Sequence, residues 1–91
     1  MSGDSLYLSM DIIRRLKSGE VVIYRCFKKL PDHGYAVQSA DRLHLPLREE
    51  DLKHHQRQLW ELLIEEAPDA RGGLFATVEE AIENFERSFA D

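Results

Sequence analysis

Residues 20–28 are apolar on both sides of an alternating pattern, and this limits the folds open to the chain. Their β-branched and aromatic residues are the types that fit a pleated sheet. Both sides of the strand carry apolar side chains. Val21, Ile23 and Phe27 lie on one side, and Val22, Tyr24 and Cys26 lie on the other. A strand of this kind lies at the centre of a sheet or is covered on both faces.

Turn residues follow this strand and predict a hairpin. Residues 31–34 combine a proline of fixed φ, an aspartate acceptor and a glycine that tolerates positive φ. The second strand is then expected at residues 35–39. Residues 43–47 alternate strictly and predict a third strand. Because Pro46 lacks the N–H that a ladder needs, this strand should lie at an edge or end at Leu45.

The segment before residue 20 allows two interpretations. In the first, Ser9 or Asp11 caps a short helix that ends at Gly19. The apolar side of that helix consists of Ile12, Ile13 and Leu16. In the second, residues 5–10 alternate as a strand. We expect the helix, with the strand as the alternative.

Two further helices are expected in the second half. Residues 48–67 begin with acidic residues and are followed by Pro68, and their apolar band is about 200° wide. Thr77 can cap a last helix while Glu80 reaches back, which is a capping box. The face that this helix should bury consists of Val78, Ala81, Ile82, Phe85 and Phe89.

Together these elements predict one α+β domain over residues 1–91, in the order α-β-β-β-α-(β)-α. The sheet is expected to be small and antiparallel with three strands, or four if residues 74–76 add a short one. Two to three helices are expected to pack mainly on one of its faces. A chain of 91 residues has room for one core.

Charge is divided unevenly between the halves of the chain. Residues 1–47 hold seven Lys and Arg against five Asp and Glu, and residues 48–91 hold five against twelve, so a +2 half and a −7 half give the net charge of −5. An acidic total argues against nucleic-acid binding, which depends on basic surface. The candidate basic patch is small and consists of Arg14, Arg15, Lys17, Arg25, Lys28 and Lys29. The negative net charge favours binding of a basic partner.

No arrangement of residues predicts catalysis, a metal site or a cofactor. His54 and His55 are neighbours and diverge by about 100° on a helix, so they cannot clasp one ion. A thiol nucleophile with a base and an orienting acid can be written from Cys26, His44 and Asp41. However, Cys26 lies in the most hydrophobic strand, where a thiol is inert. We expect the protein not to be an enzyme.

Localisation is expected to be cytoplasmic. No apolar stretch approaches the roughly 20 residues that span a bilayer. The first residues lack the basic start and apolar run of a secretory signal, and a single cysteine forms no intramolecular disulfide.

The wide apolar band of the long helix is the best candidate for a binding surface. Trp60 and Ile64 flank its leucines, with Glu61 and Glu65 beside them. Aromatic anchors with a polar rim are common in protein interfaces. We therefore predict partner binding at these four residues. The alternative is that another helix covers Trp60 and Ile64 within the monomer.

The hairpin and the later sequence Thr77-x-x-Glu80-Ala81-x-Glu83-Asn84 resemble the layout of HicB-type antitoxins, in which strands precede a helix with a similar opening. In this chain the long helix at residues 48–67 separates the two parts. The resemblance implies a small protein that neutralises a partner.

These observations predict a non-catalytic protein that acts by binding another protein, either a regulatory partner or a second copy of itself as a homodimer. One alternative is an acidic inhibitor, immunity-type or antitoxin-like protein that neutralises a basic partner. An alternative of another class is a small enzyme that uses Cys26 or a histidine. No small-molecule substrate and no membrane are indicated.

Overall fold

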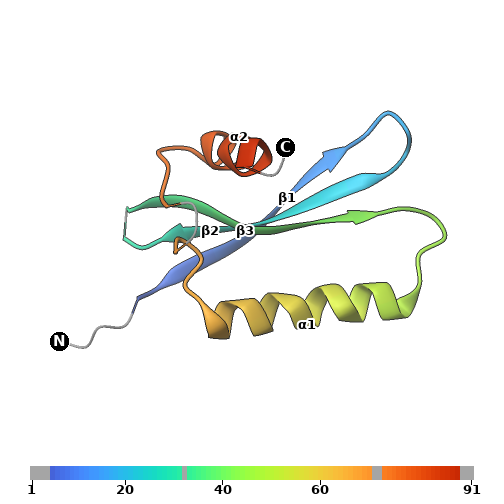
Figure 1. Cartoon of the computed structure of the whole chain (residues 1–91), viewed down its shortest axis with the longest axis horizontal. Coiled ribbons are helices and arrows are strands. Elements are labelled where there is room, and N and C mark those ends of the chain that lie inside the picture. Colours follow the sequence, from blue (N-terminus) through green and yellow to red (C-terminus); the bar gives the residue numbers. More distant parts are fainter. Residues whose placement is uncertain (1–4, 32, 71–72, 89–91) are drawn as a thin grey trace.

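A computed structural model describes residues 5–31, 33–70 and 73–88. The sheet comprises β1 (Tyr7–Arg15), β2 (Val21–Lys29) and β3 (Gly34–Leu43), and the helices are α1 (Glu49–Glu65) and α2 (Val78–Ser88). The strands are antiparallel and lie in the order β1-β2-β3 (Figure 1). The α+β class, the three-stranded antiparallel sheet and the central place of β2 are confirmed.

The predicted N-terminal helix is wrong, because this segment is strand β1. It pairs with β2 along its whole length, from Tyr7 opposite Lys29 to Arg15 opposite Val21. Gly19, expected to end a helix, lies in the turn between these strands with a φ of +96°. Cross-strand pairing with an apolar neighbour therefore decides a segment whose local pattern was ambiguous.

The expected third strand at residues 43–47 is also wrong. β3 runs from Gly34 to Leu43, so it continues four residues beyond the predicted second strand. A register shift opposite Arg25 and Cys26 keeps it paired with β2. Residues 44–48 connect it to α1. The short strand predicted at residues 74–76 is reduced to a single bridge between Tyr35 and Phe75.

The two helices lie on opposite faces of the sheet, which corrects the prediction that helices pack mainly on one face (Figure 1). On one face, Ile82 of α2 packs with Tyr24 and Cys26 of β2. On the other, Arg25 of β2 bonds to the backbone of His55 in α1. Adjacent residues of a strand point to opposite sides, so β2 is covered from both.

A hydrophobic core cluster lies between α2 and the sheet. Its buried members, Tyr24, Cys26 and Ile82, are surrounded by partly buried apolar side chains from all three strands and α2. These are Met10, Ile12, Val22, Val37, Ala40, Val78 and Phe85. The predicted apolar face of the last helix is confirmed for the residues that the structure describes, and Phe89 lies outside them.

The capping box predicted for α2 is present in its main feature. The Glu80 N–H donates to the Thr77 hydroxyl over 3.1 Å. The same hydroxyl donates a hydrogen bond to the Glu80 carboxylate over 3.3 Å. Since Glu79 and Glu80 also lie in the first turn, the positive end of the helix dipole is compensated.

Gly34 occupies a position that no larger residue fits. Its φ is +107°, and a Cβ atom there would lie 2.8 Å from the backbone oxygen of Phe75. Gly19 has a similar φ of +96° but open space around it. We expect Gly19→Ala to lower the free energy of unfolding by about 1–3 kcal/mol through backbone strain, and Gly34→Ala to cost more because the segment at Phe75 must also move. Urea denaturation of the two variants checks this, and equal losses would contradict it.

Candidate functional site

The centre of the sheet face beneath α1 is polar, although α1 itself carries a wide apolar band. Arg25 is only 4 % exposed and donates from Nη2 to the carbonyl oxygen of His55 over 3.1 Å. Its Nε lies 3.9 Å from Asp11 Oδ1 and has no hydrogen-bond partner among the described residues. Asp41 of β3 pairs with His55 Nδ1. Charged and amide groups therefore occupy the centre of this layer.

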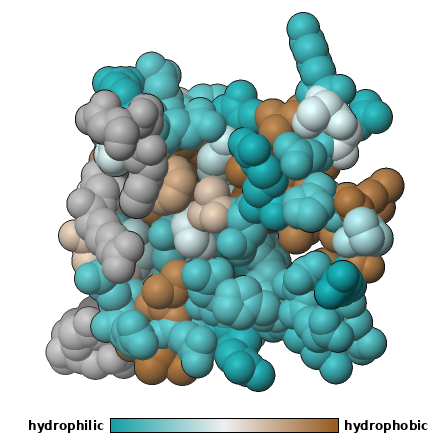
Figure 2. All heavy atoms as spheres, turned by 45° about the vertical axis from the view of Figure 1, so that its right-hand side comes forward, coloured by the Kyte–Doolittle hydropathy of each residue, from teal (hydrophilic) through white to brown (hydrophobic). Residues whose placement is uncertain are grey.

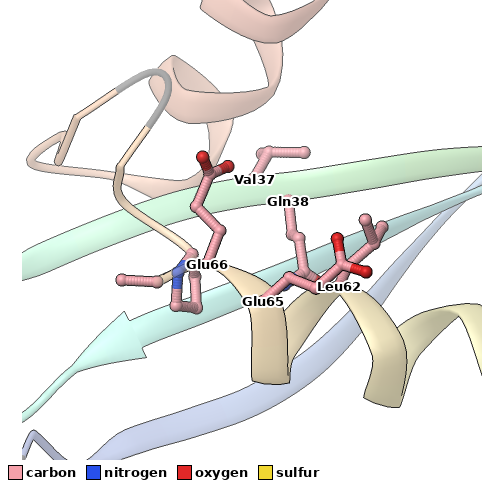
Figure 3. A pocket seen from close by; sticks show the side chains of 7 residues that line it. Val37, Gln38, Leu62, Glu65 and Glu66 are labelled. Atoms are coloured by element: carbon pink, nitrogen blue, oxygen red, sulfur yellow. The ribbon is translucent and has the colours of Figure 1, made fainter.

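Gln38 extends the polar layer toward the end of α1. Figure 3 shows its side chain reaching from β3 toward Leu62 and Glu65. A hollow of about 150 Å³ lies there, and both polar atoms of the Gln38 amide are buried without a hydrogen-bond partner among the described residues. Leaving such groups unpaired is costly, so this end of α1 is weakly held.

The polar layer explains how α1 sits on the sheet. Leu59 is its one buried residue among those described, and Leu62 and Leu63 are half-buried. Leu52 is exposed. Because polar side chains lie at the centre of the sheet on this side, the sheet covers only part of the predicted 200° band.

Trp60 and Ile64 belong to the uncovered part of that band. Trp60 is 53 % exposed and Ile64 is 83 % exposed. They lie one helical turn apart, and the side chains of Glu61 and Glu65 beside them are exposed. We call these four residues the Trp60 flank. No described helix covers Trp60 and Ile64, so the alternative of intramolecular burial does not apply to the described part of the chain.

Helical geometry shows which way the Trp60 flank points. Leu59 faces the sheet, and Leu62 lines the hollow beside β3. At about 100° per residue, Trp60 lies on the other side of Leu59 from Leu62. The apolar pair is thus turned away from the β3 edge.

The exposed apolar side chains are not confined to one place. Figure 2 shows apolar side chains in separate areas among hydrophilic ones on the face that it presents. Within residues 5–31, 33–70 and 73–88, the exposed large apolar residues are Leu6, Leu8, Ile13, Leu30, Leu45, Leu47, Leu52, Trp60 and Ile64. Trp60 is the one aromatic residue among them, which distinguishes the Trp60 flank as a candidate interface.

The residues considered for nucleophilic catalysis are not brought together. Cys26 is fully buried in the core below α2, and burial, with a smaller contribution from Asp11, raises the pKa of its thiol to about 12. Asp41 lies on the opposite face and pairs with His55 rather than with His44. Cys26 is therefore a core residue with an unreactive thiol.

The histidines gather more closely than the sequence suggested. His44, His54 and His55 line a hollow of about 220 Å³ between the end of β3 and the start of α1, with Asp41 and Asp51. Even so, no group of three or more ligand-type side chains could hold a metal ion within residues 5–31, 33–70 and 73–88.

The basic residues of the first half do not form one patch. Arg25 is buried, Arg14 bonds to Tyr24 and Glu86, and Lys29 pairs with Asp69 over 3.5 Å. These contacts tie the sheet to the segments after it, and they join residues far apart in sequence, so no local pattern indicated them.

A second such contact fixes the chain after α1. The Tyr7 hydroxyl donates to Asp69 Oδ1 over 2.8 Å. Burial alone would raise the pKa of Asp69, but this hydrogen bond and the charge of Lys29 outweigh it and lower the pKa below its usual value. The carboxylate is therefore held in its charged form.

None of the described helices is long and apolar enough to cross a membrane. Comparison of the chain with models of protein families, with curated proteins and with solved structures gave no match. The resemblance to HicB-type antitoxins therefore rests only on the hairpin and the motif at residues 77–84.

Proposed function

We propose that this protein is not an enzyme and acts by binding another protein through the Trp60 flank of α1. The main observation behind this proposal is that Trp60 and Ile64 are both exposed and lie next to each other on α1. A large aromatic side chain beside an aliphatic one offers apolar area at low cost in conformational entropy, which suits an interface anchor.

A partner with basic residues around an apolar pocket suits this flank. Glu61 and Glu65 place negative charge next to the apolar pair, and the chain as a whole carries a net charge of −5. Opposite charges around an interface speed association and exclude wrong partners. The apolar pair would then supply affinity, and the acidic rim would supply selectivity.

An inhibitor or antitoxin-like protein that neutralises a basic partner is a specific form of this proposal. It is supported by the charge of residues 48–91, where twelve acidic residues outnumber five basic ones. Exposed acidic side chains also open α2, at Glu79 and Glu80. Association steered by such charge slows as salt is added, so an on-rate that is indifferent to salt would exclude this form.

Affinity capture from native lysate tests the proposal when three forms of the tagged protein are compared. They are the wild type, the double variant Trp60→Ala with Ile64→Ala, and the double variant Leu45→Ala with Leu47→Ala. The control removes two exposed leucines from the loop before α1, so it lowers surface hydrophobicity elsewhere. We expect the wild type and the control to retain the same partner in stoichiometric amount. The Trp60 flank variant should bind it more than about tenfold more weakly.

Stability measurements make this comparison interpretable. Because Ile64 is 83 % exposed, its replacement should change the free energy of unfolding by no more than about 0.5 kcal/mol, and replacement of the half-exposed Trp60 should cost less than a core truncation. A loss of about 2–5 kcal/mol, which is typical of core truncation, would contradict the proposed interface. Equal loss of the partner by both double variants would also contradict it, as would a wild type that captures nothing.

A further inference from the structure

β1 is an open edge of the sheet and carries exposed apolar side chains beside its charged ones. Among the described residues its one neighbouring strand is β2. It has nine residues without Pro, Gly or Lys, and its register with β2 has no bulge. Leu8 is 51 % exposed and Ile13 is 61 % exposed, and Leu6 just before the strand is 71 % exposed. Natural edge strands are usually short or protected by charge, proline or a bulge.

Hydrogen bonds at the two ends of the β1–β2 hairpin fix which backbone groups of β1 point outward. The Leu30 N–H donates to the Leu6 oxygen and the Leu16 N–H to the Glu20 oxygen, each over 2.9 Å. Since hydrogen-bonded pairs alternate along an antiparallel ladder, the even-numbered residues of β1 bond to β2. The outward N–H and C=O groups belong to Tyr7, Ser9, Asp11, Ile13 and Arg15.

The sequence of β1 is complementary to itself when a two-fold axis passes through Met10. Tyr7 of one copy then lies opposite Ile13 of the other, Leu8 opposite Ile12, and Met10 opposite Met10. Ser9 and Asp11 face each other, so no like charges are directly opposed. The outward groups would form about eight backbone hydrogen bonds. Aromatic and β-branched pairs of this kind stabilise neighbouring strands.

Other axes give poorer pairs. An axis through Asp11 sets the two Asp11 carboxylates opposite each other and Leu8 opposite Arg14. An axis through Ile12 sets Met10 opposite Arg14. Axes nearer the start of the strand leave much of its second half unpaired. Like charges directly opposite each other weaken a ladder, and the axis at Met10 has none while it pairs Tyr7 with Ile13 and Leu8 with Ile12, so this axis is favoured.

We propose that two copies of this chain pair antiparallel through β1, about an axis at Met10, and join their sheets into one. The interface follows from the open edge and from the register, and it does not rest on the proposed binding at α1. Because the axis is perpendicular to the sheet, each face keeps its covering. Both α1 helices lie on one face and both α2 helices on the other, so the dimer presents two Trp60 flanks on the same side.

The mass of the full chain in solution tests this pairing. Size-exclusion chromatography with light scattering, over a wide range of concentration, should give the mass of two chains for the wild type. Ser9→Pro should give the mass of one chain. The Ser9 N–H points outward, so proline removes no bond between β1 and β2, but it interrupts the ladder between copies. A single-chain mass for the wild type at every concentration overturns the proposal.

Cross-linking tests the register and is independent of how well Ser9→Pro folds. Met10 would face Met10 in a non-hydrogen-bonded pair, where Cα atoms lie about 4.5 Å apart, within the range of a disulfide. Mild oxidation should therefore link copies of Met10→Cys. Leu8→Cys is the matched control, because its thiol faces Ile12 of the other copy. Cys26 is fully buried and does not compete. Linkage of Leu8→Cys without linkage of Met10→Cys overturns the register.

The Trp60 flank variant separates this inference from the proposed function. If the dimer persists in Ser9→Pro but dissociates in Trp60→Ala with Ile64→Ala, copies associate through α1 and the β1 pairing is wrong. If Ser9→Pro alone abolishes the dimer, the pairing stands whether or not α1 binds a partner.

Discussion

Phe27→Ala should lower the free energy of unfolding by about 3–5 kcal/mol, the largest loss that we expect from a single substitution in this chain. Phe27 is buried on the face of β2 that lies beneath α1. Its ring meets the Tyr7 ring edge-on, with the ring centroids 6.2 Å apart. Its neighbour across β3 is Ala36, which is buried and too small to fill the space. The variant would lose the aromatic contact and leave a cavity. Urea denaturation of both proteins measures the difference.

Phe27→Leu is the control for this prediction. It keeps most of the apolar volume and should cost less than about 1.5 kcal/mol. Similar losses for the two variants would show that the cavity is not the main cost. A loss below about 1 kcal/mol for Phe27→Ala would contradict the burial of this ring.

Ile82→Ala should cost about 2–5 kcal/mol, because Ile82 is the residue of α2 that completes the core with Tyr24 and Cys26. Ile64→Ala on α1 is a matched control of identical chemistry, and it should change stability by no more than about 0.5 kcal/mol. The same denaturation experiment compares them. A larger loss for Ile82→Ala than for Ile64→Ala would show that α2 stabilises the fold through apolar packing and that Ile64 does not.

An equal effect of the two isoleucine substitutions would contradict the division of roles between the helices. Loss of stability in both would mean that Ile64 is covered in solution. Loss in neither would mean that α2 contributes little to the core.

The sequence predicts those elements whose signal is local. The Thr77 capping box and the apolar spacing that follows it identify α2, since both depend on residues within a few positions of one another. The two-sided apolar pattern of β2 likewise identifies a strand covered on both faces. A strand that is covered on both faces also implies helices on both sides of the sheet. The prediction that helices pack mainly on one face did not take this into account.

The N-terminal segment could not be assigned from its own residues. Ile12 and Ile13 suit a strand or a short helix, and the choice depends on pairing with β2. The extent of β3 was missed for a related reason. Because the register shifts opposite Arg25 and Cys26, β3 stays paired with β2 as far as Leu43. The alternating leucines after Leu43 do not form a strand.

The candidate site was identified from the width of the apolar band, but its exposure could not be decided from that width. The deciding feature is the polar layer of Arg25, Gln38 and Asp41 beneath α1. These side chains come from two strands and are assembled only by the register between them, which the sequence does not reveal.

Fluorescence of Trp60, the sole tryptophan of the chain, tests the central claim most directly. The claim is that α1 leaves Trp60 and Ile64 open to solvent for a partner. At a concentration where the protein is well folded, we expect red-shifted emission, quenched by acrylamide at a large fraction of the rate seen in urea. Blue-shifted emission that acrylamide quenches poorly would show that Trp60 is covered, and would contradict the proposed interface.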